Sequence, residues 1–253
     1  MKKLSAIILS SILVAVIAFS LTACGNAGNK EAKDDNVLIM ATEATFPPYE
    51  FKEGDDFAGI DVEIAKAIAD KLGMELKIED VAFDSIIAGV STGKYDIGLA
   101  GLTVTEERMK SVNFSDSYAT GVQAIIVKEG SPIKSPDDLA NANLIGVQIS
   151  TTGDIYCADD FGEEHVKEYN TGVDAVQDLI KGTIDCVVID KEPAKQYVAA
   201  NEGLVVLETA YTEEEYAAAI SKDNEELLKT VNDVLAKLKA DGTLDKIVAK
   251  YIK

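Results

Sequence analysis

Short apolar segments of strand length alternate with segments of helical periodicity along most of this 253-residue chain. The predicted strands are residues 37–41, 74–81, 95–101, 121–127, 144–148, 166–169 and 186–190. The predicted helices are residues 60–72, 83–90, 105–112, 153–161, 172–181, 193–200, 224–240 and 243–251. This order predicts an α/β fold, in which largely parallel sheets are covered by helices on both faces.

The alternation falls into two series, one on each side of residues 121–136. Pro132 and Pro136 mark a connector within that segment, so the chain is expected to form two lobes. The last two predicted helices are amphipathic, and we interpret them as cover for a sheet that is already built.

The N-terminus has the form of a secretory signal, because Lys2 and Lys3 precede an apolar run that ends at Phe19. That run is shorter than the roughly 20 residues that a membrane-spanning helix needs. Residues 21–24 (LTAC) place a cysteine directly after small residues, which resembles the lipobox of bacterial lipoproteins. We expect a signal peptide over residues 1–23, a lipid on Cys24 and a flexible tether over residues 24–35. The alternative is an ordinary secretory signal in which Cys24 is incidental.

The strongly negative net charge argues against partners that are themselves negatively charged. It is −20 for the whole chain, and removal of Lys2 and Lys3 with the signal leaves −22. Such a body repels phosphate backbones, so no nucleic acid partner is expected. His165 is the only histidine and lies in a charged segment, where we expect it to be solvated. With a single histidine, neither a histidine-based zinc site nor a Ser–His catalytic pair is expected. The phosphate-loop and dinucleotide-binding motifs do not occur in the sequence. We expect no metal, no cofactor and no catalytic residue.

Two cysteines remain in the exported body, Cys157 and Cys186. They form either a disulfide, as exported proteins often do, or two buried thiols that act as small hydrophobes. Sequence alone leaves both possibilities open, and neither gives these residues a part in a functional site.

Polar residues follow several predicted strands, at the edge where open α/β sheets hold ligands. Thr103 and Arg108 come after the strand at 95–101. A guanidinium beside a hydroxyl can bind a carboxylate through two hydrogen-bond donors. The alternative for Arg108 is a surface ion pair with Glu107 or Asp116, which would contribute little.

Two further groups follow strands of the second series. Gln148 is followed by small hydroxyl residues up to Thr152 at a helix start, which suits either an anion site or an ordinary N-cap. Asp190 closes the apolar strand at 186–190, where it could hold an ammonium group or cap the next helix. Glu43 and Phe46 follow the first strand, and Phe83 begins the predicted helix at 83–90. Aromatic rings so placed could enclose a ligand side chain, or they could belong to the core.

Six segments taken together resemble a known family. They are ATEATFPPYEF (residues 41–51), GIDVEIAKAIA (59–69), DIGLAGLTVTEER (96–108), NFSDSY (113–118), GVQISTTG (146–153) and DCVVID (185–190). They resemble the polar amino-acid solute-binding proteins of bacterial ABC importers (family 3), and the resemblance covers nearly all of the mature chain. It implies a two-lobed, periplasmic-binding-protein-like fold of type II with two crossing hinge strands. We expect one lobe over residues 36–118 plus 216–253 and the other over residues 122–214.

The resemblance also implies roles for the polar residues. Arg108 would bind the α-carboxylate of an amino acid, helped by Thr103 and the backbone of Thr152. The α-amino group would be held by Asp190, the Gly101 carbonyl and the Thr103 hydroxyl.

Further implied contacts concern the ligand side chain. Phe46 and Phe83 would flank it, with Glu43 and Gln148 at its end. Glu43 favours a cationic or amide end, so arginine and lysine lead, histidine and glutamine follow, and cystine is an alternative ligand. The chain departs from the family at Ser150, where glycine is frequent, so its helix-entry turn is expected to differ slightly.

The expected partners are therefore an amino acid, an ABC permease and a membrane reached through the lipid anchor, on the extracytoplasmic face, with the protein as a monomer. Two rival hypotheses are a dehydratase-like enzyme on the same scaffold and the sensor lobe of a receptor or kinase. The enzyme needs a free general acid or base, whereas each candidate carboxylate here already has a binding role. The sensor lobe needs a transmembrane segment and further domains, which we do not expect here.

Overall fold

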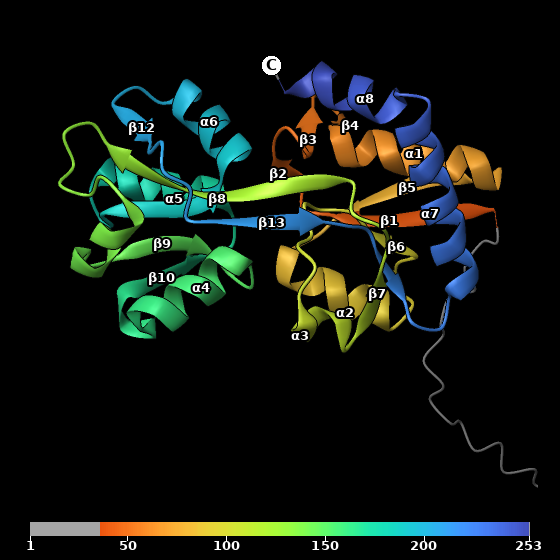
Figure 1. Ribbon diagram of the computed structural model, residues 1–253, viewed down its shortest axis with the longest axis horizontal. Coiled ribbons are helices and arrows are strands. Elements are labelled where there is room, and N and C mark those ends of the chain that lie inside the picture. The colour runs from red at the N-terminus through yellow and green to blue at the C-terminus, as the bar shows by residue number, and fades with distance from the viewer. Residues whose placement is uncertain (1–35, 253) are drawn as a thin grey trace, which may run out of the picture. The chain divides into compact units, whose positions relative to one another are not determined.

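The computed structural model describes residues 36–252, and it has two lobes, each built around its own sheet (Figure 1). The predicted signal peptide, the tether and Cys24 lie outside the described residues. The α/β fold class expected from the sequence is confirmed.

The first sheet has the order β5-β1-β6-β14-β7. Its strands are β1 (Val37–Thr42), β5 (Glu75–Asp80), β6 (Ile97–Gly98), β7 (Val112–Phe114) and β14 (Ala219–Ser221). β1 pairs in parallel with β5 and β6, whereas β14 is antiparallel to β6 and β7. The chain therefore returns to this sheet after it has built the second one.

Helices cover this sheet. α1 (Ile60–Leu72), α7 (Glu225–Ala240) and α8 (Thr243–Tyr251) pack against one another, while α2 (Ile86–Ser91) packs against β1, β6 and β14. The remaining small elements are β2 (Thr45–Phe46), β3 (Glu50–Glu53), β4 (Asp56–Ala58), the 3-10 turn η1 (Phe83–Ser85) and α3 (Glu106–Met109). The first three of these form a separate three-stranded sheet.

The second sheet has the order β10-β9-β11-β8-β12, with β13 added on β8. Its strands are β8 (Ala119–Lys128), β9 (Ile145–Gln148), β10 (Val166–Tyr169), β11 (Cys186–Asp190), β12 (Leu204–Val206) and β13 (Thr212–Tyr216). Its helices are α4 (Thr152–Phe161), α5 (Gly172–Lys181) and α6 (Lys191–Ala200), with the 3-10 turns η2 (Pro136–Asn141) and η3 (Glu163–His165).

Two antiparallel strands, β8 and β13, run between the lobes (Figure 1). These are the two crossing strands that the resemblance implied. β13 was not among the strands predicted from apolar pattern, because its sequence TEEEY is mostly charged. It forms because its backbone pairs along β8, and because Tyr216 at its end is fully buried.

Helix boundaries follow local sequence where capping is clear. α1 spans the predicted residues and ends at Gly73, whose φ of 70° is the left-handed conformation that glycine adopts at low cost. The helix predicted at 105–112 is wrong at its end, since α3 stops at Met109 and Val112 begins β7. The strand predicted at 95–101 is also shorter, and Gly101 uses its N–H on a side chain instead of a strand neighbour.

Three side-chain expectations can be compared with the structure. Cys157 and Cys186 are free thiols, both buried in the core of the second lobe. Burial raises the pKa of Cys186 to about 12, which keeps that thiol protonated and unreactive. The expectation that His165 is solvated is wrong, because it is half-buried and its Nδ1 lies 3.1 Å from the Ala142 carbonyl oxygen.

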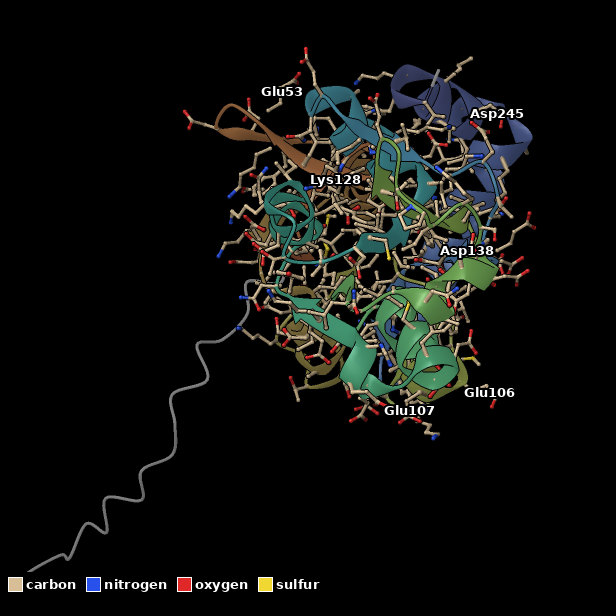
Figure 2. All side chains as sticks on the ribbon, turned by 90° about the vertical axis from the view of Figure 1, so that its left-hand side faces the viewer. Glu53, Glu106, Glu107, Lys128, Asp138 and Asp245 are labelled. Carbon is tan, nitrogen blue, oxygen red and sulfur yellow. The ribbon has the colours of Figure 1, made fainter. Side chains whose placement is uncertain are left out.

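Charged side chains cover the outside of the body. Figure 2 shows Glu53 at the tip of the β3–β4 hairpin and Glu107 on the surface, both pointing outward. Among the helices of residues 36–252, none is long and apolar enough to cross a membrane.

Candidate ligand-binding site

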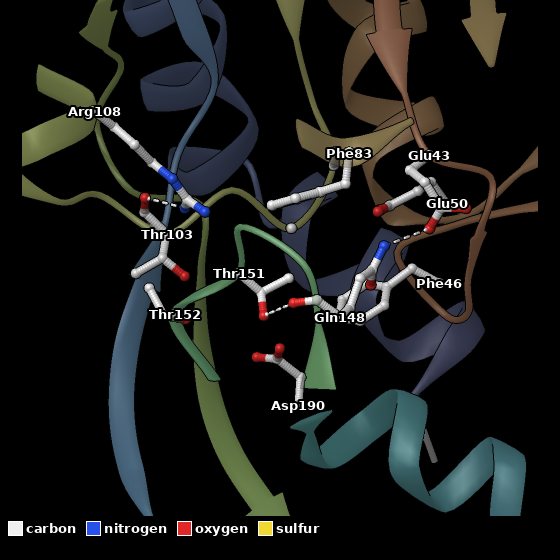
Figure 3. Close-up of a pocket in the computed structure, with 12 residues that line it drawn as sticks. Glu43, Phe46, Glu50, Phe83, Thr103, Arg108, Gln148, Thr151, Thr152 and Asp190 are labelled. Carbon is white, nitrogen blue, oxygen red and sulfur yellow. Dashed lines mark hydrogen bonds between the residues drawn. The ribbon is translucent and has the colours of Figure 1, made fainter. Parts of the chain in front are cut away.

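One cavity is lined by all nine residues that the sequence proposed for ligand binding (Figure 3). Its lining is Glu43, Phe46, Glu50, Phe83, Ala100, Gly101, Thr103, Arg108, Gln148, Thr151, Thr152 and Asp190.

Strand ends bring these residues together. Glu43 follows β1, Gly101 and Thr103 follow β6, and Gln148 and Asp190 close β9 and β11. In parallel sheets the carboxyl ends of the strands share one edge, so residues distant in sequence converge there. The first lobe supplies the residues up to Arg108, and the second supplies those from Gln148 onward.

Arg108 is half-buried, and its guanidinium bonds backbone carbonyls of both lobes. Nη1 donates to the Thr103 carbonyl at 2.8 Å and Nη2 donates to the Ser150 carbonyl at 3.0 Å. Its guanidinium carbon also lies 5.3 Å from the centre of the Phe83 ring. The alternative of a surface ion pair with Glu107 is wrong, because Glu107 pairs with Lys110.

Asp190 is buried at the start of α6, yet its side chain does not cap that helix. Its Oδ2 accepts a 2.9 Å hydrogen bond from the Gln123 amide, and its Oδ1 accepts one from the Tyr216 hydroxyl. Burial, and next the charge of Glu214, raise the pKa of Asp190 well above its usual value. A cation placed beside this carboxylate would therefore be strongly favoured.

Glu43 is 6% exposed and lies at the other end of the cavity from Arg108 (Figure 3). The Thr45 hydroxyl donates to its two oxygens at 2.7 and 2.9 Å, and the Gln148 amide reaches it across the lobes at 3.4 Å. Burial raises the pKa of Glu43, and these two hydrogen bonds oppose the shift.

The aromatic residues lie between these ends. Phe46 is buried and Phe83 is half-buried, and both face the cavity (Figure 3). Gly101 has a φ of 53°, and a β-carbon there would lie 3.0 Å from the Phe46 ring. Glycine is therefore required at this position so that the chain can turn beside Phe46.

Thr152 begins α4, but the residue that caps it is Thr151, whose hydroxyl accepts the Asp154 N–H. Thr103 lies close by in the cavity and its hydroxyl donates to Glu214 at 3.1 Å, which leaves its oxygen able to accept. Ser150 has a φ of 62°, the left-handed conformation that glycine adopts at low cost, while the expectation that its helix-entry turn differs from the family stays a prediction.

Three lining residues were not predicted: Glu50, Ala100 and Thr151. All three lie inside the six quoted segments, next to residues that were chosen. Glu50 follows Pro47–Pro48 and gave no separate signal, because nothing in the local pattern shows that its carboxyl group is buried. Its place in the cavity wall depends on how β3 packs against α1.

The arrangement is complementary to a zwitterion. A guanidinium and a buried carboxylate line one cavity, and a second carboxylate lies beyond two aromatic rings. Within residues 36–252, no group of three or more His, Cys, Asp or Glu side chains is placed to hold a metal ion.

Comparison with known proteins gives a consistent result. The model of the bacterial extracellular solute-binding proteins, family 3, matches residues 38–253. The chain is 34% identical to the arginine-binding extracellular protein ArtP of Bacillus subtilis (strain 168), over 95% of each chain. It is 33% identical to the L-cystine-binding protein TcyJ of Escherichia coli (strain K12), over 87% of this chain and 84% of that one.

A solved structure agrees with these relatives. An ancestral arginine-binding protein bound to arginine superposes with a TM-score of 0.80 at 40% identity, covering 86% of this chain and 99% of the other. The likeness therefore extends over both lobes.

Proposed function

Because the chain belongs to the bacterial extracellular solute-binding proteins of family 3, we propose that it captures a basic amino acid, arginine first, for an ABC permease. It acts as a solute-binding protein and not as an enzyme. In the proposed order of preference, lysine follows arginine, and histidine and glutamine come after lysine.

One observation carries this proposal: Arg108 and Asp190 line the same cavity from different lobes. An α-amino acid carries a carboxylate and an ammonium group on neighbouring atoms, so it needs a cation and an anion together in a site with little water. Arg108 binds the carboxylate with Thr103 and the Thr152 backbone, and Asp190 binds the ammonium group with Gly101 and Thr103. Only a ligand that touches both lobes favours the closed form over an open one.

The side-chain preference depends on Glu43. Its buried carboxylate lies at the end of the cavity opposite Arg108, past Phe46 and Phe83, where a cationic group would balance it. Gln148 adds an amide beside it. The similarity to ArtP and to an arginine-bound ancestral protein supports arginine, and the similarity to TcyJ keeps cystine as the alternative ligand.

Thermal unfolding with each of the twenty amino acids and cystine tests the proposal. Binding to the native state alone raises the melting temperature, by an amount that grows with affinity. We expect arginine and lysine to give the largest increases. A largest increase with cystine would select the alternative ligand, and no increase with any amino acid would overturn the function.

We further propose a membrane anchor. Residues 21–24 support cleavage before Cys24 and a lipid on its sulfur, which would hold the protein at the outer face of the cell membrane near its permease. Cys24→Ser should release the protein into the medium, whereas Cys157→Ser should leave it on the membrane. Retention of the Cys24→Ser variant would contradict the anchor.

The lobe limits and the oligomeric state are also proposals. The sheet membership of β14 supports a first lobe of residues 36–118 plus 216–253 and a second of residues 122–214. We propose a monomer, and a light-scattering mass of one copy would support it, which is 27.0 kDa for the whole chain and correspondingly less without residues 1–23.

A further inference from the structure

Two acids meet in the wall of the cavity, Glu50 and Asp61. Glu50 lines the cavity and is 1% exposed, and Asp61 in the first turn of α1 is fully buried behind it. Their carboxyl groups are in hydrogen-bonding contact. Asp61 Oδ2 also accepts the Gly101 N–H at 2.9 Å and the Tyr118 hydroxyl at 2.7 Å.

Each carboxyl group of this pair has a buried oxygen without a protein donor. Among the described residues, Glu50 Oε2 and Asp61 Oδ1 are buried atoms without a hydrogen-bond partner. Two carboxylates cannot bond each other when both are ionised, because each is then only an acceptor. A single proton shared by the pair satisfies the contact, and since Asp61 already accepts two other donors, the proton belongs on Glu50.

The groups around Glu50 provide no positive charge to replace that proton. Among the described residues, the titratable groups that face it are Asp61 from α1, Glu43 after β1, Tyr49 before β3, Tyr118 before β8, Asp190 at the end of β11 and Tyr197 from α6. Burial, then the charges of Asp61 and Glu43, raise the pKa of Glu50 well above its usual value. The pair therefore holds a proton at neutral pH while the cavity has no ligand.

Glu50 also lies where the ligand side chain ends. Figure 3 shows Glu50 beside Glu43, at the end of the cavity away from Arg108. A cationic ligand group that reaches Glu43 therefore also comes close to Glu50. A cation there stabilises the ionised form of Glu50, so the proton leaves as the cation enters.

We propose that Glu50 is a further specificity residue, and that the Glu50–Asp61 pair exchanges one bound proton for the cationic end of the ligand. This inference rests on the proposed function and names the charge of the side chain that the site selects. In the exchange, the O–H bond of the Glu50 carboxyl breaks, the proton passes to the buffer, and the ligand cation pairs with the carboxylate that remains.

The exchange has a measurable consequence. Because the proton competes with the cation, affinity for arginine should rise with pH between pH 5.5 and 7.5, by up to about tenfold per unit if one proton is released. Citrulline has the shape of arginine but a neutral end, so its affinity should rise less steeply with pH than that of arginine, by only the part that Asp190 contributes to both ligands.

Titration calorimetry of the purified chain tests this. Arginine and citrulline are titrated at one pH in buffers of different ionisation enthalpy, and the slope of observed enthalpy against buffer enthalpy gives the protons released. We expect up to one proton for arginine beyond any released by citrulline. Glu50→Gln keeps a donor for Asp61 but cannot ionise, so it should lose this release and about tenfold in arginine affinity, while citrulline binding stays within twofold.

Glu53→Gln is the matched control, since it removes an exposed carboxylate from the same strand and should change nothing (Figure 2). Equal proton release for arginine and citrulline in the parent would overturn the inference, even if Glu50→Gln fails to fold. So would release that survives in Glu50→Gln but disappears in Glu43→Gln, or an equal loss of affinity for both ligands in Glu50→Gln. A parent protein that binds no amino acid would instead overturn the proposed function.

Discussion

The two lobes contribute different chemistry to the cavity. The first lobe supplies Arg108, both phenylalanines and the acids Glu43 and Glu50, whereas the second supplies hydroxyls, one amide and Asp190. On our account the first lobe supplies the charged partner of the α-carboxylate and the acids that discriminate between side chains. The second lobe supplies the charged partner of the α-amino group, which every amino acid shares, so its charge contributes little to selectivity.

The charged groups of the two lobes are also supported differently. Arg108 bonds carbonyls of both lobes and can exchange them for a ligand carboxylate. Asp190 is held by the Gln123 amide and the Tyr216 hydroxyl, both from the crossing strands. Because neither donor carries a charge, burial favours the protonated form of Asp190 in the empty site, and the ammonium group of the ligand replaces that proton.

The largest effect should come from the first lobe. Arg108→Lys should weaken binding of every amino acid by about 100-fold or more, since lysine cannot present two parallel donors to a carboxylate. Calorimetry against arginine, glutamine and citrulline measures the loss. Lys110→Arg, an exposed neighbour that pairs with Glu107, is the control and should bind like the parent. Parental binding by Arg108→Lys would refute the carboxylate contact.

The second lobe should give the next largest effect. Asp190→Asn should weaken the binding of all amino acids by a similar factor of about 10 to 100, because it acts on the α-amino group that they share. Glu192→Gln, in the first turn of α6 and paired with Lys195, is the control. A loss confined to basic ligands would show that Asp190 discriminates between side chains, against the division between lobes.

The same variant should change how stability depends on pH. The folded pKa of Asp190 is raised, so its contribution to stability is fully present below about pH 4 and is lost as pH rises through that higher pKa. The melting temperature of the ligand-free parent should therefore fall more between pH 5 and pH 8 than the melting temperature of Asp190→Asn does. An equal loss in both proteins would contradict an Asp190 that is protonated in the empty site.

A smaller and more selective effect is expected at Glu43. Glu43→Gln should lower the affinity for arginine about tenfold and leave the affinity for glutamine within twofold of the parent's. The reason is that only a cationic side chain pairs with the charge that is removed. The ratio of the two dissociation constants is the measurement. If both ligands weaken alike, Glu43 supports the fold and the first lobe does not select charge.

The smallest effect on binding should come from the core of the second lobe. Cys157→Ala should lower the free energy of unfolding by about 1 kcal/mol through lost packing, with ligand affinity within twofold. Denaturant unfolding and calorimetry on one preparation separate the two quantities. A clear loss of affinity in a folded variant would give this thiol a functional role.

The sequence was informative where local rules decide the structure. α1, α5, α8 and β11 have their predicted bounds, since periodicity and capping define them without help from distant residues. The cavity residues were found because strand ends converge at one edge and because the family motifs are specific in combination. The prediction that Arg108 and Asp190 bind ligand depended on that resemblance, since each residue had a plausible local alternative.

What could not be predicted depends on contacts between distant segments. β13 is a strand because β8 offers it a free edge, and its five residues TEEEY show no strand pattern. The proton shared by Glu50 and Asp61 is likewise invisible locally, because it requires β3 and α1 to bury two acids side by side.

The central claim is that Arg108 and Asp190 bind the two α-groups of one amino acid, and altered ligands test it most directly. Calorimetry of the unmodified protein compares arginine with agmatine, which lacks the α-carboxylate, and with N-acetylarginine, whose α-nitrogen carries no charge. The account predicts that each binds at least about 100-fold more weakly than arginine, because each leaves one charged partner unmatched. Agmatine binding as tightly as arginine would contradict it.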